Sequence, residues 1–231
     1  MLHEPRLLLL LQWFDASFPT GAYTQSFGLE TYIQEGVVRD GGTLAEFVCA
    51  YLSGPLLYTD AIALRSVYEW TSAGETEHVF AVDNLLAAQC LPSEVREGAR
   101  RMGERLLRLM GDLFPEQVVW VEYRTRIREH AAYGHPAVVY GLALAQVGIP
   151  LRQGLTAYLF ACVNALVQNG VRAIPLGQTE GQRLLMRLHS RIMACAERAL
   201  ALDWDDFGAV SPGMELAQMR HERLDVRIFM S

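Results

Sequence analysis

The sequence predicts an all-α fold, a single domain of about ten helices over residues 1–231. Apolar residues recur at steps of three and four through most of the chain, the period of a helix with one buried face. Hydrophobic residues make up 51% of the sequence, which is enough for a core and too much for a disordered chain. No linker-like composition, low-complexity tract or internal repeat divides it.

The predicted helices follow one another from end to end. They span roughly residues 6–16, 24–35, 43–54, 55–71, 76–89, 93–113, 136–147, 151–171, 179–202 and 212–227. The sixth has the clearest pattern, because Val95, Ala99, Met102 and Leu106 fall on one face.

Prolines mark several of the predicted helix starts. Pro55, Pro92, Pro136 and Pro212 suit a first helical position, where a missing N–H costs least, and Ser211 is a candidate N-cap. The only strand-like run is Val118–Tyr123, which is short and isolated.

The amino terminus superficially resembles a signal peptide, with Arg6 followed by Leu7–Leu11. Its apolar run is short, polar residues interrupt its surroundings, and no cleavage site is obvious. We interpret it as a buried first helix. Since no run of about 18 apolar residues occurs elsewhere, we expect no membrane span.

Charge and cysteine content exclude several functions. The net charge of −6 argues against a nucleic-acid partner bound by a basic surface. All 20 basic residues are arginine, so a P-loop lysine or a Schiff-base lysine is absent and any nucleotide chemistry would need a partner's site. Four widely spaced cysteines without a CxxC motif predict reduced thiols in a cytoplasmic protein.

Residues 175–182, Pro-Leu-Gly-Gln-Thr-Glu-Gly-Gln, form a polar stretch between two strongly apolar helical patterns. Arg172 lies in the last turn of the preceding helix, where a cation is favoured. Thr179 and Gln182 have the spacing of a capping box, and Pro175 is an alternative helix start. The pattern is consistent both with a self-satisfied helix corner and with a binding surface.

A second polar segment, residues 18–30, begins as a Pro/Gly turn and runs into a predicted helix. Gly28 falls inside that helix, where it costs about 1 kcal/mol relative to alanine, which suggests the close approach of another backbone. Ser26 and Glu30 share one face. A turn followed by a helix crossing explains the pattern equally well.

The third segment is the carboxyl terminus, residues 211–231. Arg220, Arg223 and Arg227 form a cationic stripe at helical spacing. A chain that ends in Ile228-Phe229-Met230 is expected to dock on its own body or on a partner.

Together these segments resemble signatures of the UreF family of urease accessory proteins over nearly the whole chain. Residues 19–30 look like P-x-G-x-[FY]-[ST]-x-S-x-G-L-E, and residues 164–182 look like N-A-…-R-x-x-P-L-G-Q-T-[DE]-G-Q. The carboxyl terminus looks like S-P-x-x-x-x-x-x-M-x-H-E-…-R-x-F, and Gly134-His135-Pro136 with Gly141 looks like a fourth element. Departures are mild, with Glu180 where aspartate is common and Gln218 where a small residue is usual.

The resemblance implies a cytoplasmic, all-helical homodimer that does no bond chemistry and holds no cofactor. It implies a scaffold that binds the UreD/UreH accessory protein and the GTPase UreG, assists nickel delivery into apo-urease, and regulates GTP hydrolysis by UreG in a direction that the sequence leaves open.

The resemblance also assigns partner-binding residues. Docking of UreD/UreH is assigned to Arg220, His221, Glu222, Arg227 and Phe229. A polar functional surface, or a helix junction at the dimer, is assigned to Pro19, Gly21, Tyr23, Ser26, Gly28, Glu30, Arg172, Pro175, Gly177, Gln178, Thr179 and Gln182.

A permanent metal site is not predicted, because the histidines are scattered and neighbours such as His221 and Glu222 do not face the same way on a helix. A transient or dimer-bridging metal contact through His135 or His221 stays open. The alternative function is a helical enzyme with an interior pocket. A helical transcription regulator would need a basic amino-terminal helix-turn-helix, whereas Arg6 is the only arginine in the first 38 residues.

Overall fold

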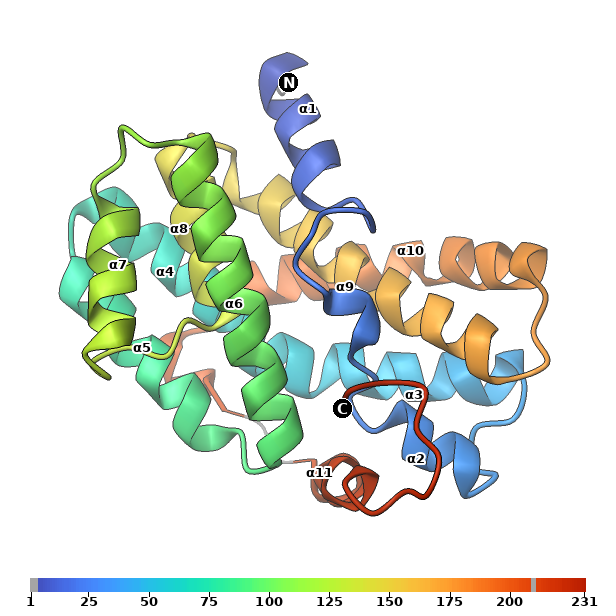
Figure 1. The fold of residues 1–231 in the computed structure, drawn as a ribbon. Coiled ribbons are helices and arrows are strands. Elements are labelled where there is room, and N and C mark those ends of the chain that lie inside the picture. The colour runs from blue at the N-terminus through green and yellow to red at the C-terminus, as the bar shows by residue number, and fades with distance from the viewer. Residues whose placement is uncertain (1–3, 209–210) are drawn as a thin grey trace.

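The computed structural model describes residues 4–208 and 211–231 and consists of helices joined by turns (Figure 1). No strand occurs among these residues, and the predicted all-α bundle is confirmed. The α-helices are α1 (Glu4–Trp13), α2 (Leu29–Gln34), α3 (Gly41–Ser53), α4 (Ile62–Ala73), α5 (Thr76–Gln89), α6 (Ser93–Leu113), α7 (Val119–Arg128), α8 (Pro136–Gln146), α9 (Leu151–Ala173), α10 (Gln178–Ala201) and α11 (Pro212–His221). Shorter elements are the 3-10 turns η1 (Ala22–Thr24) and η3 (Trp204–Asp206) and the π-helical η2 (Leu56–Ala61).

Helix α4 lies at the centre of the core. Every residue from 61 to 67 is buried, and the helix packs most extensively against α8. Gly141 of α8 allows this packing, since a Cβ there would lie 2.8 Å from the carbonyl oxygen of Leu64. The core therefore explains one of the glycines in the predicted signatures.

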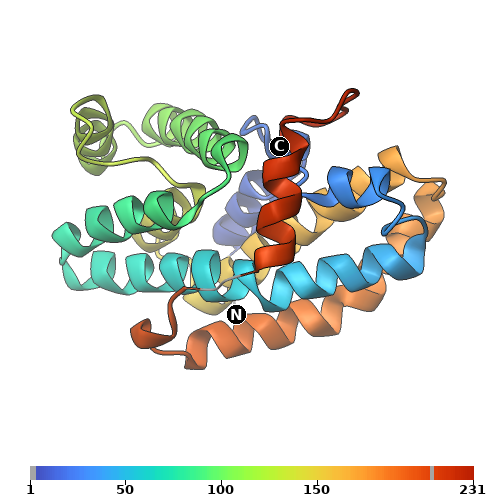
Figure 2. The same cartoon turned by 90° about the horizontal axis from the view of Figure 1, so that it is seen from below.

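Helices α3 and α4 continue one another through η2, and α10 runs beside them (Figure 2). The stretch Gly41–Ala73 is the one described segment long and apolar enough by composition to cross a membrane, and 56% of its most apolar window is buried inside the fold. That burial is typical of a core helix.

The two ends of the chain meet the bundle differently (Figure 1). Helix α1 projects from the body, and its exposed side chains include Leu7, Leu8 and Leu11, whereas Leu10 and Trp13 are buried. The prediction of a buried first helix is therefore wrong for much of α1. The carboxyl terminus packs against the body, where Ser231 is buried, and α11 crosses the outside of the bundle (Figure 2).

The strand-like run Val118–Tyr123 forms the start of α7, a helix that is absent from the predicted set. Trp120 and Tyr123, three residues apart, are both fully buried, which is the spacing of a helical face. The β-branched valines of this run gave a local strand signal, and packing of the two aromatic rings outweighs it.

The predicted helix over residues 24–35 is also wrong in its first half. Gly28 does not lie inside a helix: it precedes α2 with φ of +87°, a left-handed conformation that favours glycine. The chain instead forms η1, a turn, and the short helix α2.

The last helix ends at His221, six residues earlier than predicted. Arg227 lies beyond it, so the predicted helical stripe of Arg220, Arg223 and Arg227 does not exist. Pro212 does begin the helix, as expected, with Ser211 before it, although the Ser211 side chain makes no capping hydrogen bond.

Candidate partner-binding site

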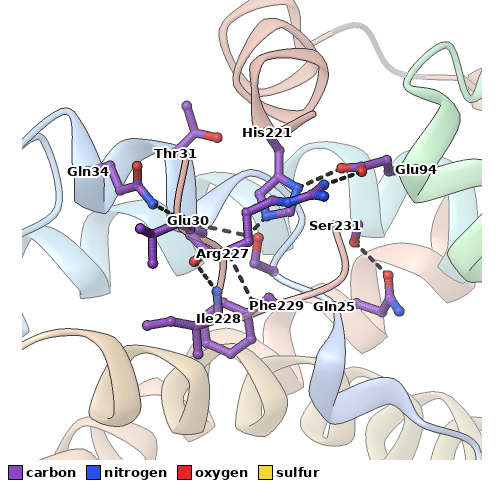
Figure 3. A network of polar contacts seen from close by, with 12 residues as sticks. Gln25, Glu30, Thr31, Gln34, Glu94, His221, Arg227, Ile228, Phe229 and Ser231 are labelled. Carbon is purple, nitrogen blue, oxygen red and sulfur yellow. Dashed lines mark hydrogen bonds and ion pairs between the residues drawn. The ribbon is translucent and has the colours of Figure 1, made fainter. Parts of the chain in front are cut away.

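Glu30 lies in a network of polar contacts that joins α2, α6, α11 and the chain end (Figure 3). It stands in the first turn of α2, where a carboxylate is favoured by the free backbone N–H groups, and only 2% of it is exposed. Its carboxylate accepts hydrogen bonds from the backbone N–H of Ile228 at 2.6 Å and of Phe229 at 3.0 Å. Ile228 and Phe229 are not in a helix, so their backbone N–H groups have no intrahelical acceptor. The Glu30 carboxylate accepts these two hydrogen bonds instead.

His221, the last residue of α11, is fully buried between two carboxylates (Figure 3). Its Nε2 lies 2.9 Å from Glu30 Oε2 and its Nδ1 lies 2.6 Å from Glu94 Oε2. A neutral imidazole donates from only one of its nitrogens, so the second contact needs a further proton, either on the imidazole or on a carboxyl group. Arg227 donates to the other oxygen of Glu94 at 2.7 Å.

Residues 222–231, called the tail below, lie along the amino-terminal turn (residues 18–28). Backbone hydrogen bonds join Met230 N to Thr24 O at 2.8 Å and Ser26 N to Ser231 O at 2.7 Å. The Ser231 hydroxyl also contacts Gln25 Oε1 at 2.5 Å. The tail is thus fixed by its backbone as well as by its side chains.

Side chains of the tail alternate between the body and solvent. Phe229 is 5% exposed and Ser231 is buried, whereas Ile228 is 60% and Met230 is 48% exposed. Val226, before them, is 72% exposed. The tail therefore turns the three apolar side chains of Val226, Ile228 and Met230 outward. We call these three side chains the outer apolar face.

Gly28 is the point where α11 crosses the amino-terminal turn. A Cβ at Gly28 would lie 3.3 Å from Met214 O and 3.4 Å from Ala217 Cβ. The Thr31 hydroxyl donates to Ala217 O at 2.8 Å across the same contact. The sequence argument for a close backbone approach at Gly28 is confirmed, although its helical position was wrong.

The end of α9 holds the turn from the other side. Asn169 is fully buried and donates to Gln25 O at 2.7 Å. Arg172 donates to Tyr23 O at 2.5 Å and to the Asn169 side chain, and its guanidinium lies 5.0 Å from the centre of the Phe229 ring. Parts of three predicted signatures, those at residues 19–30, 164–182 and the carboxyl terminus, therefore meet in one junction of turn, tail and α9.

The corner between α9 and α10, residues 175–182, behaves differently. Helix α10 begins at Gln178 with Gly177 as its N-cap, without a side-chain capping bond. The Thr179–Gln182 capping box and the Pro175 helix start are both wrong. Most of the corner is exposed, including Pro175, Gly177, Gln178, Thr179 and Gln182.

The remaining predicted residues lie around the junction. Pro19 is exposed, and Tyr23 is 54% exposed. Gly21 is buried with φ of +84°. Ser26 is fully buried, and its hydroxyl accepts a hydrogen bond from the Glu30 backbone N–H at 3.5 Å. Arg220 pairs with Glu35 at 3.1 Å on the surface, and Glu222 accepts a hydrogen bond from the Ser93 hydroxyl at 2.5 Å.

Sequence reasoning missed Glu94 and Asp83. Glu94 follows Pro92 in the first turn of α6, a position that favours an acid, but the polar face of that helix read as solvated. Asp83 is fully buried and accepts hydrogen bonds from three consecutive backbone N–H groups, Tyr133, Gly134 and His135, at 2.6–2.8 Å. Burial beside this carboxylate raises the pKa of Tyr123 well above its ordinary value.

Within the described ranges, no three His, Cys, Asp or Glu side chains are grouped to hold a metal ion. All four cysteines are free and partly buried. Burial is the main cause that raises the pKa of the Cys90 thiol to about 11, so this thiol is protonated at neutral pH.

The fold and the junction together define an all-helical protein whose signature residues pack distant segments of the chain against one another. The UreF family model matches residues 38–189. The chain is 45% identical over 224 residues to the urease accessory protein UreF of Paenarthrobacter aurescens (strain TC1), covering 97% of each chain. It is 44% identical over 226 residues to the namesake from Bacillus sp. (strain TB-90), covering 98% of this chain and 99% of that one. For Geobacillus kaustophilus (strain HTA426) the identity is 40% over 228 residues, 99% of each.

The chain therefore belongs to the UreF family of urease accessory proteins. It is an accessory protein of urease maturation and not an enzyme, and the predicted family resemblance is confirmed. The enzyme alternative is wrong, although the fold does contain a partly open cavity.

Proposed function

We propose that this protein is a cytoplasmic, homodimeric scaffold of urease maturation. In this proposal it joins the UreD/UreH accessory protein to the GTPase UreG, regulates GTP hydrolysis by UreG, and assists nickel transfer into apo-urease. The observation that carries the proposal is the outer apolar face, an exposed hydrophobic surface on a terminus that a buried polar group fixes in place.

The outer apolar face is the proposed docking surface for UreD/UreH. Val226, Ile228 and Met230 are exposed and apolar, and their backbone is already ordered, so docking costs little conformational entropy. His221 and Phe229 face inward, and their proposed contribution is to hold the tail in the conformation that the partner meets. In this proposal the exposed Arg220 and Arg227 contribute to the polar rim of the docking surface.

A pull-down with purified UreD/UreH tests this assignment. Ile228→Asp combined with Met230→Asp places two charges on the outer face without removing an internal contact of Phe229. We expect at least a tenfold loss of binding, about 1.4 kcal/mol. Val118→Asp, which charges an apolar side chain that is 76% exposed in α6–α7, is the matched control. Equal binding by the double variant and the control contradicts the proposal.

The corner is the proposed contact for a second copy of the chain. Gln178, Thr179 and Gln182 are exposed in a region whose backbone is fixed by two long helices, so their polar groups are free for a partner. Sedimentation of Gln178→Arg with Gln182→Arg tests this, because like charges repel across a two-fold interface. We expect a larger monomer fraction than in wild type; an unchanged dimer removes the corner from the interface.

A further inference from the structure

A partly open cavity of about 250 Å³ lies apart from the buried polar group at Glu30. Each of the four signature segments contributes to its lining, through Tyr23, His135, Asn164 and Met214 respectively. The volume is close to the lower end of small-molecule sites, roughly 300–1,000 Å³. The exposed Tyr23 stands at its rim.

The cavity lining carries negative but no positive side chains. None of the 20 arginines lines it, whereas Asp15, Asp60 and Glu215 do. Asp15 is exposed and bonded to Ser17, and Glu215 accepts the Ser211 backbone N–H at 3.0 Å. Asp60 is therefore the carboxylate that gives the cavity its charge.

Asp60 lies in η2, a π-helical turn of the kind that is frequent at functional sites. The Tyr158 hydroxyl donates to its Oδ2 at 2.6 Å, and the Thr59 hydroxyl lies 3.1 Å from its Oδ1. The single Thr59 proton is shared with Pro55 O, only 2.5 Å away. Among the described residues Asp60 has no ion-pair partner, so its charge and part of its accepting capacity are left for a ligand.

Aromatic rings line the same cavity as this carboxylate. Phe14 stacks on Tyr140 with centroids 4.7 Å apart, and Tyr158 contacts both rings at 6.4 and 5.8 Å. Tyr51 lines the same cavity. Ring faces are negative, so a carboxylate among aromatic rings favours a cation that has apolar surface of its own.

A metal ion fits these donors poorly. Cys90 and Cys162 line the cavity, but burial raises the pKa of both thiols, and Asp60 raises them further. Protonated thiols are weak ligands, and across the residues that the structure describes no trio of His, Cys, Asp or Glu converges. An organic cation needs only one carboxylate and an apolar wall.

We propose that this cavity binds a small organic cation, a primary ammonium group on an apolar body, with the ammonium at Asp60 and the body against Phe14, Tyr140 and Tyr158. This inference goes beyond the scaffold function and does not depend on it.

Calorimetric titration of the full chain with benzylamine tests the proposal, with benzyl alcohol as the neutral analogue of the same shape. We expect benzylammonium to bind wild type and to bind Asp60→Asn about tenfold or more weakly, since a charged hydrogen bond is lost. Asp15→Asn, at the rim, is the matched control and should bind as wild type does. Ala161→Phe, which fills the cavity from α9 without changing Asp60, should abolish binding and covers the case that Asp60→Asn fails to fold.

Three results overturn the proposal: benzyl alcohol binds as tightly as benzylammonium, Ala161→Phe leaves benzylammonium binding unchanged, or no probe binds. A parallel titration with Ni²⁺ alone separates the metal alternative. If Ni²⁺ binds in a way that requires Asp60 and benzylammonium does not bind, the ligand of this cavity is a metal ion and the proposal of an organic cation is wrong.

Discussion

At the junction of turn, tail and α9, charged side chains are buried and apolar side chains face solvent. Glu30 is 2% and His221 0% exposed, while Val226 and Ile228 are largely exposed. At the corner between α9 and α10, Gln178 and Thr179 are exposed instead. Both regions are polar signature segments, so polarity in the sequence does not reveal whether a segment binds its own chain or is left for a partner.

Substitutions at the junction should destabilise the protein more than substitutions at the corner, and Glu30→Gln should destabilise it most. It removes a buried charge that accepts from His221 and from two backbone N–H groups. Breaking a buried pair in this way costs about 3–5 kcal/mol. Amide hydrogen exchange should show loss of protection at Phe229 and Met230, because the tail detaches before the bundle unfolds.

Glu35→Gln is the control for Glu30→Gln, since Glu35 pairs with Arg220 on the surface and such pairs contribute about 0–1 kcal/mol. Unchanged exchange of the tail amides in Glu30→Gln would mean that the buried group does not hold the tail.

A pair of glycine substitutions separates the two regions. Gly28→Ala forces a side chain into a left-handed conformation against Met214 O and should cost about 1–3 kcal/mol. Gly177 has φ of −70° and open space around it, so Gly177→Ala should change the free energy of unfolding by no more than about 0.5 kcal/mol. Urea midpoints at constant m-value measure both. Similar midpoints for the two variants would erase the contrast.

Arg172 connects the two regions, because it ends α9 at the corner and contacts Tyr23 and Phe229 at the junction. Arg172→Lys keeps the charge but loses the planar fork, and we expect a loss of about 1 kcal/mol. The midpoint temperature of thermal unfolding should fall by roughly 2–4 °C for a chain of this size. Arg183→Lys, exposed on α10, should not change it; equal shifts would show that the Arg172 contacts contribute nothing.

The smallest expected effect is at Thr179. Thr179→Ala should change the free energy of unfolding by less than about 0.5 kcal/mol, because Thr179 is exposed inside the first turn of α10 and caps nothing. A helix cap would cost about 1 kcal/mol. Chemical denaturation distinguishes the two, and a loss near the larger value would restore the capping box.

Helical periodicity was reliable where an element is long and amphipathic, as in α6 and α10, because many residues repeat the same signal. The periodicity gave the wrong secondary structure where the conformation or packing of a single residue determines it. Gly28 reads as an interruption inside a helix until its positive φ is known, and the valines before Tyr123 favour a strand until Trp120 is seen to pack. Glu94 was invisible as a site residue, since its partners Arg227 and His221 are more than 100 residues away.

Fold class and family could both be inferred from the amino-acid sequence alone, because helical period and short ordered motifs are local properties that many residues specify together. Its composition also determined that chemistry based on lysine is absent. Only the tertiary structure decided which polar residues are used within the chain. Burial of Glu30, and the unpaired charge of Asp60, depend on long-range packing that brings distant segments to one place, and no local pattern encodes that distance.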